Sequence, residues 1–329
     1  MNLDNYVQFE RVEEGVIRDG KLMPFQESNT PAEDKAVATT LIVTNYNREG
    51  TIEGALDSAL ACSSEEGEVE ILVVDDGSTD RSKEILRGYA DRGLVRLVEL
   101  GFNSGSEALP KNIAAFLASG EYLSYLDSDD RMGDRDAFDT SLRVLREHPE
   151  AAMTVSNLIF EVNCTRDQIA QSMPWLLEVD LYDAPEALRD PRACEYRRRM
   201  AEEHSVFELL NHGYYDAFKL MRKRLYLETG GLVESLKSCG DFGTYLRLNR
   251  HGSTIPIQRD FYVYRIHGEN DSFYDVDYAA FIEAQHRAFA LEEIRHRGLS
   301  YDSLRENCQE EFWARYRFTR EEVLGPQNI

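Results

Sequence analysis

Acidic side chains gather at two places where a run of apolar residues ends abruptly. Residues 73–80 are VVDDGSTD, and residues 126–130, further along the chain, are LDSDD. An apolar run of this kind predicts a strand that is buried on both faces, and open α/β sheets bind their ligands beyond the carboxyl ends of such strands. Carboxylates this close together repel one another unless a cation or hydrogen-bond donors hold them, and divalent cations favour oxygen ligands. The two clusters therefore predict a metal-dependent site for a nucleotide that carries phosphates.

Strands and helices are predicted to alternate around these clusters. Apolar runs predict strands over residues 38–43, 69–74, 94–100, 122–126 and 151–156, and apolar positions at helical spacing predict a helix after each of the first four. This alternation is typical of an α/β protein with a doubly wound, mostly parallel, Rossmann-like sheet. Its carboxyl edge would bring the two acidic clusters together.

The remaining segments differ from this core in composition. Residues 1–36 are polar and contain Pro24 and Pro31, which predicts an N-terminal extension that lies on the surface or is partly disordered. A charged stretch over 165–205 predicts a helical insertion, and apolar stripes after Phe273 predict a helical C-terminal extension over 276–329, with a single helix over 301–323. The main domain is expected over 37–275, divided into a nucleotide half, 37–132, and a second half, 133–275.

Charge and composition exclude several classes of protein. The chain has 329 residues and a net charge of −23, which disfavours nucleic acid and anionic membranes, because both are bound through cationic groups. No apolar stretch approaches the roughly 20 residues of a membrane span, and the N-terminus lacks the pattern of a signal peptide. The five scattered cysteines lack a C-x-x-C pair, so free thiols are expected. These features predict a cytoplasmic protein with no integral membrane segment.

The ordered set of motifs resembles the family 2 glycosyltransferases. The resemblance rests on residues 43–48 (VTNYNR), 73–80, 103–105 (NSG), 111–112 (KN), 120–122 (GEY) and 126–130, with fainter matches at 220–223, 230–232, 240–242, 246–248 and 264–267. It implies a GT-A fold and inverting transfer of a hexosyl or N-acetylhexosaminyl group from a nucleotide sugar, with UDP favoured. Two departures stand out: Lys111 replaces a frequent arginine, and Gly240 replaces the glutamate that usually precedes Asp241.

The resemblance also assigns roles to single residues. Asp129 and His267 would hold Mn²⁺ or Mg²⁺, and Asp241 would be the catalytic base. The nucleotide sugar would be bound by Thr44, Tyr46, Asn47, Arg48, Asp76, Asn103, Lys111, Asp127, Ser128 and Arg265. Within this set, Asp76 would accept a hydrogen bond from N3 of uracil, and Tyr46 would stack on the base.

Each of these roles has a simpler structural alternative. The acids at 127–130 could form an Asp-rich turn that caps the next helix. Asp75, Asp76 and Asp241 could likewise be helix caps, and His267 could be a surface histidine.

Three functions and several partners remain open at this point. Besides the transferase, the chain could be a sugar-phosphate nucleotidyltransferase, although that class expects a glycine-rich loop where residues 44–47 stand. It could also be a non-catalytic module that binds a nucleotide sugar. The acceptor would be a carbohydrate, lipid-linked or small-molecule hydroxyl, shaped in part by residues 165–215. The aromatic residues over 312–318 could pack in the core, touch a lipid-linked acceptor or form a homodimer through the C-terminal helices.

Overall fold

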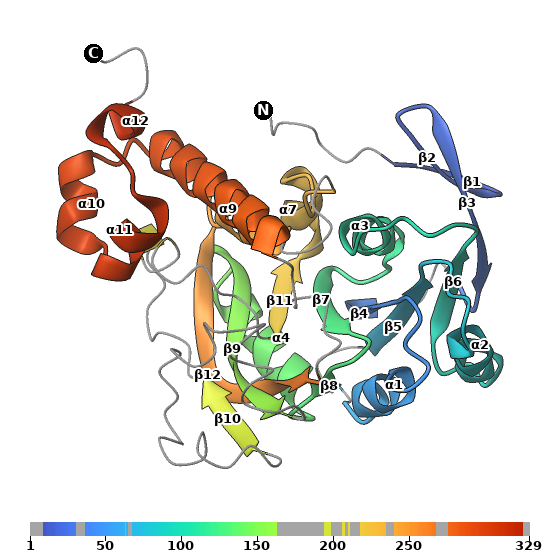
Figure 1. Cartoon of the computed structure of the whole chain (residues 1–329). Helices are drawn as coiled ribbons and strands as arrows, with labels where there is room; N and C mark the ends of the chain where they lie inside the picture. The colour runs from blue at the N-terminus through green and yellow to red at the C-terminus, as the bar shows by residue number, and fades with distance from the viewer. Residues whose placement is uncertain are drawn as a thin grey trace.

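A single mixed β-sheet organises the chain (Figure 1). The computed structural model describes residues 9–30, 37–62, 64, 68–162, 194–198, 206–207, 210, 218–234, 240–267 and 276–324. The strand order is β1-β2-β3-β6-β5-β4-β7-β11-β9-β12-β8, and β10 pairs with β9 outside this path.

The nucleotide half is built as the sequence predicts. Its strands are β4 (Val37–Asn45), β5 (Glu68–Asp75), β6 (Arg96–Leu100) and β7 (Tyr122–Asp127), joined by α1 (Ile52–Leu60), α2 (Ser82–Asp91) and α3 (Ala108–Leu117). Neighbouring strands in the order β6-β5-β4-β7 are parallel. The chain moves outward from β4 to β6 and then crosses back to β7, so the order reverses between β4 and β7. Ligands of doubly wound sheets bind at such a reversal.

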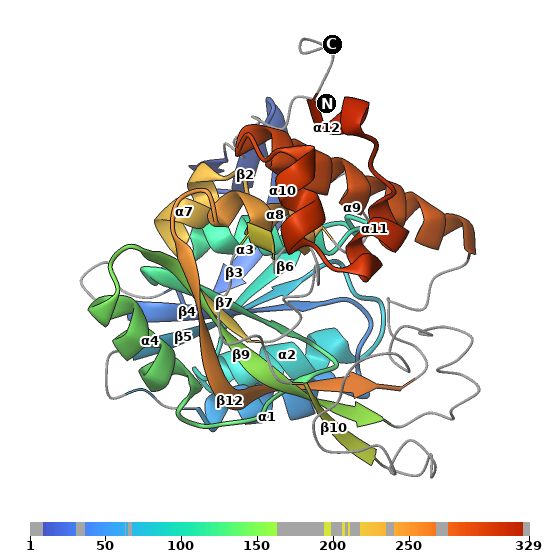
Figure 2. The ribbon, with the colours of Figure 1, turned by 90° about the vertical axis from the view of Figure 1, so that its left-hand side faces the viewer.

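Helices cover both faces of this sheet, which explains why its strands are apolar on both sides. In Figure 2, α3 lies on one face together with α7 (Lys223–Glu228) and α8 (Asp241–Leu248), whereas α1 and α2 lie on the other.

The second half of the domain, 133–275, departs from the predicted parallel pattern; the resemblance implies that it binds the acceptor, and it is called the acceptor half. Strand β8 (Arg131–Met132) lies at the end of the nucleotide half. The acceptor half contains β9 (Ala151–Val162), β10 (Cys194–Arg198), β11 (Lys219–Arg222) and β12 (Ser253–Ile266), and α4 (Ala137–Glu147) packs against β9, β11 and β12. Strand β8 runs antiparallel to β12, β11 runs antiparallel to both β7 and β9, and β9 and β12 are parallel. The sheet is therefore parallel from β6 to β7 and mixed beyond β7.

The predicted helical insertion lies mostly outside the described residues. Within it, residues 194–198 form strand β10, so the prediction of helix is wrong there. The reason lies in β9, which runs on to Val162 instead of ending at Ser156 and offers its last residues to β10 as an antiparallel partner.

The N-terminal extension contributes strands to the same sheet. Strands β1 (Glu10–Val12), β2 (Gly15–Arg18) and β3 (Lys21–Ser28) form an antiparallel meander, and β3 pairs with β6. Pairing with the open edge of β6 depends on backbone hydrogen bonds rather than on a buried apolar face. The polar composition of residues 9–30 therefore hid these strands. Residues of β3 alternate between exposed and half-buried, so this segment lies at the surface as expected; its pairing with the sheet was not predicted.

The C-terminal extension is helical but more broken than predicted. It contains α9 (Val276–His296), α10 (Tyr301–Asn307), α11 (Glu310–Tyr316) and α12 (Arg320–Leu324). The single helix predicted over 301–323 is wrong, because Cys308 is extended (φ −99°, ψ 141°) and Arg317 is left-handed (φ 48°). Phe312, Tyr316 and Phe318 are buried within this chain, so these aromatics pack in the core. The homodimer stays a prediction.

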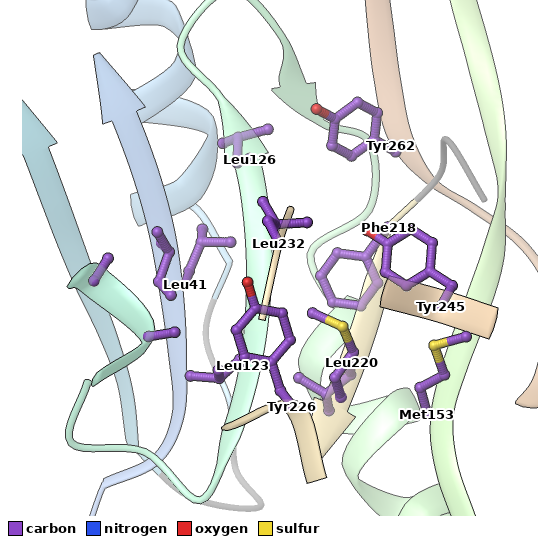
Figure 3. Packing of buried hydrophobic residues seen from close by; sticks show 14 of the residues in the cluster. Leu41, Leu123, Leu126, Met153, Phe218, Leu220, Tyr226, Leu232, Tyr245 and Tyr262 are labelled. Atoms are coloured by element: carbon purple, nitrogen blue, oxygen red, sulfur yellow. The ribbon is translucent and has the colours of Figure 1, made fainter. Parts of the chain in front are cut away.

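One apolar core runs through both halves of the sheet. Figure 3 shows Leu41 and Leu123 from the parallel strands near Tyr226, Leu220 and Met153 from the acceptor half, and all five are fully buried. The two halves are thus joined by shared packing. Among the helices of the described residues, none is long and apolar enough to cross a membrane.

Candidate active site

Two turns meet at the carboxyl ends of β4 and β5. The Asn45 amide donates to Asp75 Oδ1 (2.9 Å) and Ser78 Oγ (3.0 Å). Asn47 Oδ1 accepts from the backbone N–H of Thr79 at 2.7 Å, and Asn47 has a left-handed backbone (φ 52°), which asparagine tolerates better than most residues. The side chain of Asn47, predicted to bind the nucleotide, therefore holds the two turns together.

Asp76 faces the loop after β6. Its carboxylate accepts from the Ser104 backbone N–H (3.0 Å) and from Ser104 Oγ (2.7 Å). Burial raises the pKa of Asp76 to about 6, against the hydrogen bonds from Ser104, and the charge of Asp75 adds to the rise. Gly77 permits this approach, because a Cβ there would lie 2.6 Å from the carbonyl oxygen of Phe102.

The helix-cap alternative does not describe Asp76. The side chain that accepts from the start of α2 is Asp80, whose Oδ1 lies 2.9 Å from the backbone nitrogen of Ser82. Two further predicted nucleotide residues lie near this edge. Tyr46 follows β4 with 44% of its surface exposed, and the exposed Asn103 accepts from the Gly105 backbone at 2.5 Å. An exposed ring beside a buried carboxylate is compatible with stacking on a base.

The turn after β7 brings Asp129 and His267 together. His267 Nε2 lies 3.2 Å from Asp129 Oδ2, and Arg48 Nε lies 3.6 Å from the same oxygen. Burial alone would raise the pKa of Asp129, but the hydrogen bond with His267 and the charge of Arg48 hold it below its usual range. Arg48 lies in the loop after β4, Asp129 in the turn after β7, and His267 directly after β12. Three distant segments therefore meet at the Asp129 carboxylate.

Asp130 is a residue whose role the sequence analysis missed. It is buried, and its carboxylate accepts from Tyr262 Oη and from the backbone N–H of Arg265, both at 2.7 Å. Tyr262 Oη in turn accepts from the Asp127 backbone at 3.2 Å. Burial raises the pKa of Asp130 well above its usual range, and the charges of Asp129 and Asp127 add to this. These bonds tie the acidic turn to β12 and so place His267 beside Asp129.

Arg265 and Ser128 are held within the same turn region. Arg265 Nε lies 3.3 Å from Glu161 Oε1, and its guanidinium also lies 3.4 Å from the carbonyl oxygen of Asp129. Ser128 is buried at 6% exposure. Both lie beside Asp129, and the Arg265 guanidinium is bound in part by other residues of the protein.

Lys111 joins α3 to the acidic turn. Its Nζ lies 2.9 Å from Asp127 Oδ1 and 2.9 Å from Glu107 Oε2. Burial opposes the charge of Lys111, but these two carboxylates raise its pKa well above the usual value. Thr44 lies next to this contact, because it is paired with Asp127 across β4 and β7. The structure therefore brings together Lys111, Asp127 and Thr44, three of the residues predicted to bind the nucleotide sugar.

Asp241 is the first residue of α8, and Gly240 occupies the N-cap position. Asp241 Oδ1 accepts from the backbone N–H of Phe242 at 3.0 Å. Burial raises the pKa of Glu107, and the charges of Asp127 and Asp241 contribute to the rise, against the pull of Lys111. Asp241 thus faces the same electrostatic environment as the Lys111–Asp127 pair.

Three of the five histidines that the structure describes lie at the surface, and one of them is His296. His148 has a side chain that is 49% exposed, and His251 is exposed as well. Among the cysteines whose side chains the structure describes, Cys62 and Cys308 form no disulfide.

Comparison with known proteins places this geometry in a family. Residues 40–229, more than half of the chain, match the family described as glycosyl transferase family 2. The chain belongs to this family. The ordered motifs from Val43 to Asp130 are therefore family 2 motifs, as the sequence indicated.

Two of the named relatives are much longer than this chain. It is 38% identical over 95 residues to a poly(ribitol-phosphate) beta-glucosyltransferase of Bacillus spizizenii, a match that covers 29% of this chain and 15% of the relative. It is 25% identical over 259 residues to a chondroitin synthase of Pasteurella multocida, which covers 78% of this chain and 23% of the relative. The chain thus spans less than a quarter of each.

Solved structures confirm the predicted GT-A fold. S. aureus TarS 1–349 in complex with UDP-GlcNAc aligns with a TM-score of 0.62 at 19% identity, over 86% of this chain and 74% of that one. The mannosyltransferase PcManGT from Pyrobaculum calidifontis, in complex with GDP-Man and Mn²⁺, aligns with a TM-score of 0.51 at 18% identity, over 94% and 74%.

Proposed function

We propose that this chain is an inverting glycosyltransferase that moves a sugar from a UDP-linked donor to a hydroxyl acceptor. The observation that carries the proposal is the convergence of Asp129 and His267, 3.2 Å apart, at the point where the sheet order reverses. The acceptor would be a carbohydrate, a lipid-linked molecule or a small molecule.

Nucleotide recognition would use the edge formed by β4, β5 and the loop after β6. Each oxygen of a carboxylate can accept two hydrogen bonds, so the bonds from Ser104 leave Asp76 able to accept from N3 of uracil. Tyr46 would stack on the base, with Thr44 and Asn103 at the edge of the pocket. UDP is bound in a solved structure of S. aureus TarS and GDP-Man in that of PcManGT, so proteins with this fold differ in the base that they bind.

Asp129 and His267 would hold a divalent cation. One carboxylate oxygen and one imidazole nitrogen suit Mn²⁺, and Mg²⁺ is held by one or two carboxylates together with substrate phosphates. The described residues contain no cluster of three such side chains, so phosphate oxygens and water would complete the coordination. When bound, the ion would act as a Lewis acid that stabilises charge on the departing diphosphate.

The cationic side chains alone do not balance a diphosphate. Lys111 already faces Glu107 and Asp127, and Arg48 faces Asp129. A donor with two phosphates would therefore add negative charge to an acidic site, which favours the requirement for a metal ion.

Transfer would be a single displacement. The acceptor oxygen attacks the anomeric carbon, the bond from that carbon to the phosphate oxygen breaks, and UDP leaves with the electron pair. Asp241 would take the proton of the acceptor hydroxyl. Its place at the start of α8, in the electrostatic field it shares with Glu107 and Asp127, supports this role.

Calorimetric titration of UDP with and without Mn²⁺ tests the metal assignment. Asp129→Ala should abolish the Mn²⁺-dependent part of UDP binding while leaving the melting temperature within a few degrees of wild type. Asp134→Ala is the matched control, because Asp134 lies on the same segment but pairs with Arg259 at 2.5 Å. Unchanged UDP affinity in Asp129→Ala would remove Asp129 from the metal site.

Competition among nucleotides tests the choice of base. UDP should bind more tightly than GDP, ADP or CDP, and a clear preference for GDP would contradict the role given to Asp76. Hydrolysis of a UDP-sugar in the presence of Mn²⁺ then separates an enzyme from a module that only binds the donor. Binding without any hydrolysis or transfer across the common UDP-sugars would favour the module.

A further inference from the structure

The N-terminal strands lie outside the residues matched to the family, yet they reach the acceptor half. They lie beside α3 (Figure 1). The ring of Phe9, which precedes β1, lies 5.6 Å from that of Phe116 on α3. The guanidinium of Arg18, the last residue of β2, sits 5.5 Å from the ring of Phe9. Arg18 also forms an ion pair with Glu234, a residue that precedes α8. A segment far from the family motifs thus contacts the part of the chain that leads to Asp241.

Glu234 connects this ion pair to α3. Its Oε1 accepts from the side-chain amide of Asn112 at 2.7 Å, and the side chains of Arg18 and Glu234 are only 20% and 17% exposed. Partial burial and a second hydrogen bond distinguish this pair from an ordinary surface ion pair, which contributes little.

Asn112 holds the turn that carries Glu234. Its Oδ1 accepts from the backbone N–H of Leu232 (2.8 Å) and from Tyr226 Oη (2.9 Å), and its amide donates to the carbonyl of Leu232 (3.0 Å). Gly231 lies against it with φ +66°, and a Cβ there would be 2.3 Å from Asn112 Oδ1. The buried amide of Asn112 is thus bonded on both sides, which fixes the turn against α3.

The same turn holds α8. The carbonyl of Gly231 accepts from Thr244 Oγ1 and from the Arg247 guanidinium, both at 2.8 Å. The carbonyl of Val233 would be 3.1 Å from a Cβ at Gly240, the residue before Asp241. Asn112 directly follows Lys111, a candidate donor-binding residue. The turn that Asn112 holds lies against Gly240 through Val233, and Gly240 directly precedes the candidate base, Asp241.

We propose that Arg18 is a positioning residue, which acts through Glu234 and Asn112 to fix Asp241 relative to Lys111 and the donor. This inference rests on the proposed transferase function. It gives the N-terminal strands a role in turnover: they would clamp the turn that sets the distance between donor and base. Donor binding itself should not depend on Arg18, because Arg18 contacts none of the residues proposed to bind the nucleotide in the described structure.

Steady-state kinetics of Arg18→Ala test this role. We expect kcat to fall about tenfold, because small displacements of a catalytic group are costly, while the donor KM and the Kd for UDP stay within about twofold. Arg18→Lys should restore most of kcat, since it keeps the charge opposite Glu234. Arg11→Ala is the matched control: Arg11 lies in the same strands and pairs with Glu27 at 2.5 Å, but it does not reach the turn.

Three results would overturn the proposal: kcat unchanged in Arg18→Ala, an equal loss in Arg11→Ala, or a parallel loss of UDP affinity. Glu234→Gln gives a second route, because it removes the charge but keeps an oxygen that can accept from Asn112. It should reproduce the loss of Arg18→Ala, and the double variant should lose no more than either single one.

Hydrogen exchange separates this proposal from the proposed function. Amides of residues 244–248 should exchange faster in Arg18→Ala than in wild type or Arg11→Ala, whether or not any sugar is transferred. Faster exchange in a protein without transferase activity would refute the function and keep the clamp, and unchanged exchange in an active protein would refute the clamp alone.

Discussion

Charged side chains lie at both ends of the parallel strands. The two groups differ in how completely their charges and hydrogen-bonding atoms are paired within the protein. At the amino end, Arg96 donates to Glu27 (2.6 Å) and to Glu70 (2.8 Å). Glu70 also accepts from Thr40 Oγ1 (2.5 Å) and from both the backbone and hydroxyl of Ser119 (2.9 and 3.0 Å). The side chains of Arg96, Glu70 and Glu27 are 3%, 4% and 9% exposed. This network is closed, in the sense that its three charged side chains are buried and are bonded to one another and to neighbouring donors.

At the carboxyl end, the acids outnumber the bases and stay partly open. Asp127 has a 44% exposed side chain although it pairs with Lys111, and Asp129 is shared by Arg48 and His267. Asp76 and Asp130 are both raised in pKa. Both shifts are caused first by burial. Acids with a raised pKa are typical of functional sites, whereas saturated pairs are typical of structural ones. The candidate site therefore differs from the structural network in how completely its charged groups are paired and hydrogen-bonded, rather than in how many charges it contains.

The largest effect should come from removing the proposed base, Asp241, at the open end. In Asp241→Asn the amide keeps the shape of the side chain and loses its basicity, so kcat should fall roughly 10³-fold, about 4 kcal/mol of transition-state stabilisation. UDP affinity should stay unchanged, which calorimetry of the same variant checks. Turnover within about tenfold of wild type, a loss under roughly 1.4 kcal/mol, would mean that Asp241 only begins α8 and that the base lies elsewhere.

A change at the closed end should affect stability and leave nucleotide binding alone. Burial would raise the pKa of Glu70, but hydrogen bonds from Thr40, Ser119 and Arg96 lower it overall. Glu70→Gln leaves the buried Arg96 with one carboxylate fewer, so the free energy of unfolding at pH 7 should fall by about 3 kcal/mol. The UDP affinity of the folded protein should match wild type.

The pH dependence adds a check on Glu70. A lowered pKa contributes stability above the ordinary glutamate pKa, and this contribution is lost as the pH falls through the lowered value. The difference between wild type and Glu70→Gln should therefore shrink in acid. Arg87→Ala is the control, because the Arg87 side chain is 55% exposed and pairs with Glu99 of β6, the strand that also carries Arg96. This variant should change the free energy of unfolding by less than about 1 kcal/mol. An equal effect of the two variants would contradict the closed network.

The nucleotide half could be predicted from sequence because its signals are local. Each strand is a short apolar run followed at once by its functional turn, so the spacing alone places Asp76 after β5 and Asp129 after β7. The topology of a doubly wound sheet then brings both turns to one edge. The pair of Asp129 and His267 needed the family resemblance as well, because nothing in the local pattern links a residue after β7 to one after β12.

The missed features depend on contacts between distant residues. Asp130 looked like one more acid of a turn, and only the fold brings Tyr262 to it. Strand β10 depends on the free end of β9, and β3 depends on the edge of β6. The breaks at Cys308 and Arg317 interrupt a stripe that remains amphipathic across them. In each case tertiary pairing, rather than local preference, decides the outcome.

The smallest effect expected is a pH dependence at Asp76, which lies at the open end but is 5% exposed. Its pKa of about 6, raised first by burial, means that it loses its charge just below neutral pH. A charged acceptor binds a donor more strongly than a neutral one, by about 1 kcal/mol. The affinity for UDP should therefore weaken roughly fivefold between pH 7 and pH 5.

Stability should move in the opposite direction. A carboxyl with a pKa above its unfolded value binds its proton more tightly in the folded state, so the fold gains stability as the pH falls through about 6. The control is Asp76→Asn, measured by calorimetry and thermal melting at the same pH values. Ionisation of the UDP phosphates is common to both proteins and cancels in the comparison. Wild type should lose UDP affinity and gain stability relative to Asp76→Asn as the pH falls. If the two proteins keep parallel profiles, Asp76 serves only to hold Ser104, and it belongs with the closed, structural network despite its place beside the site.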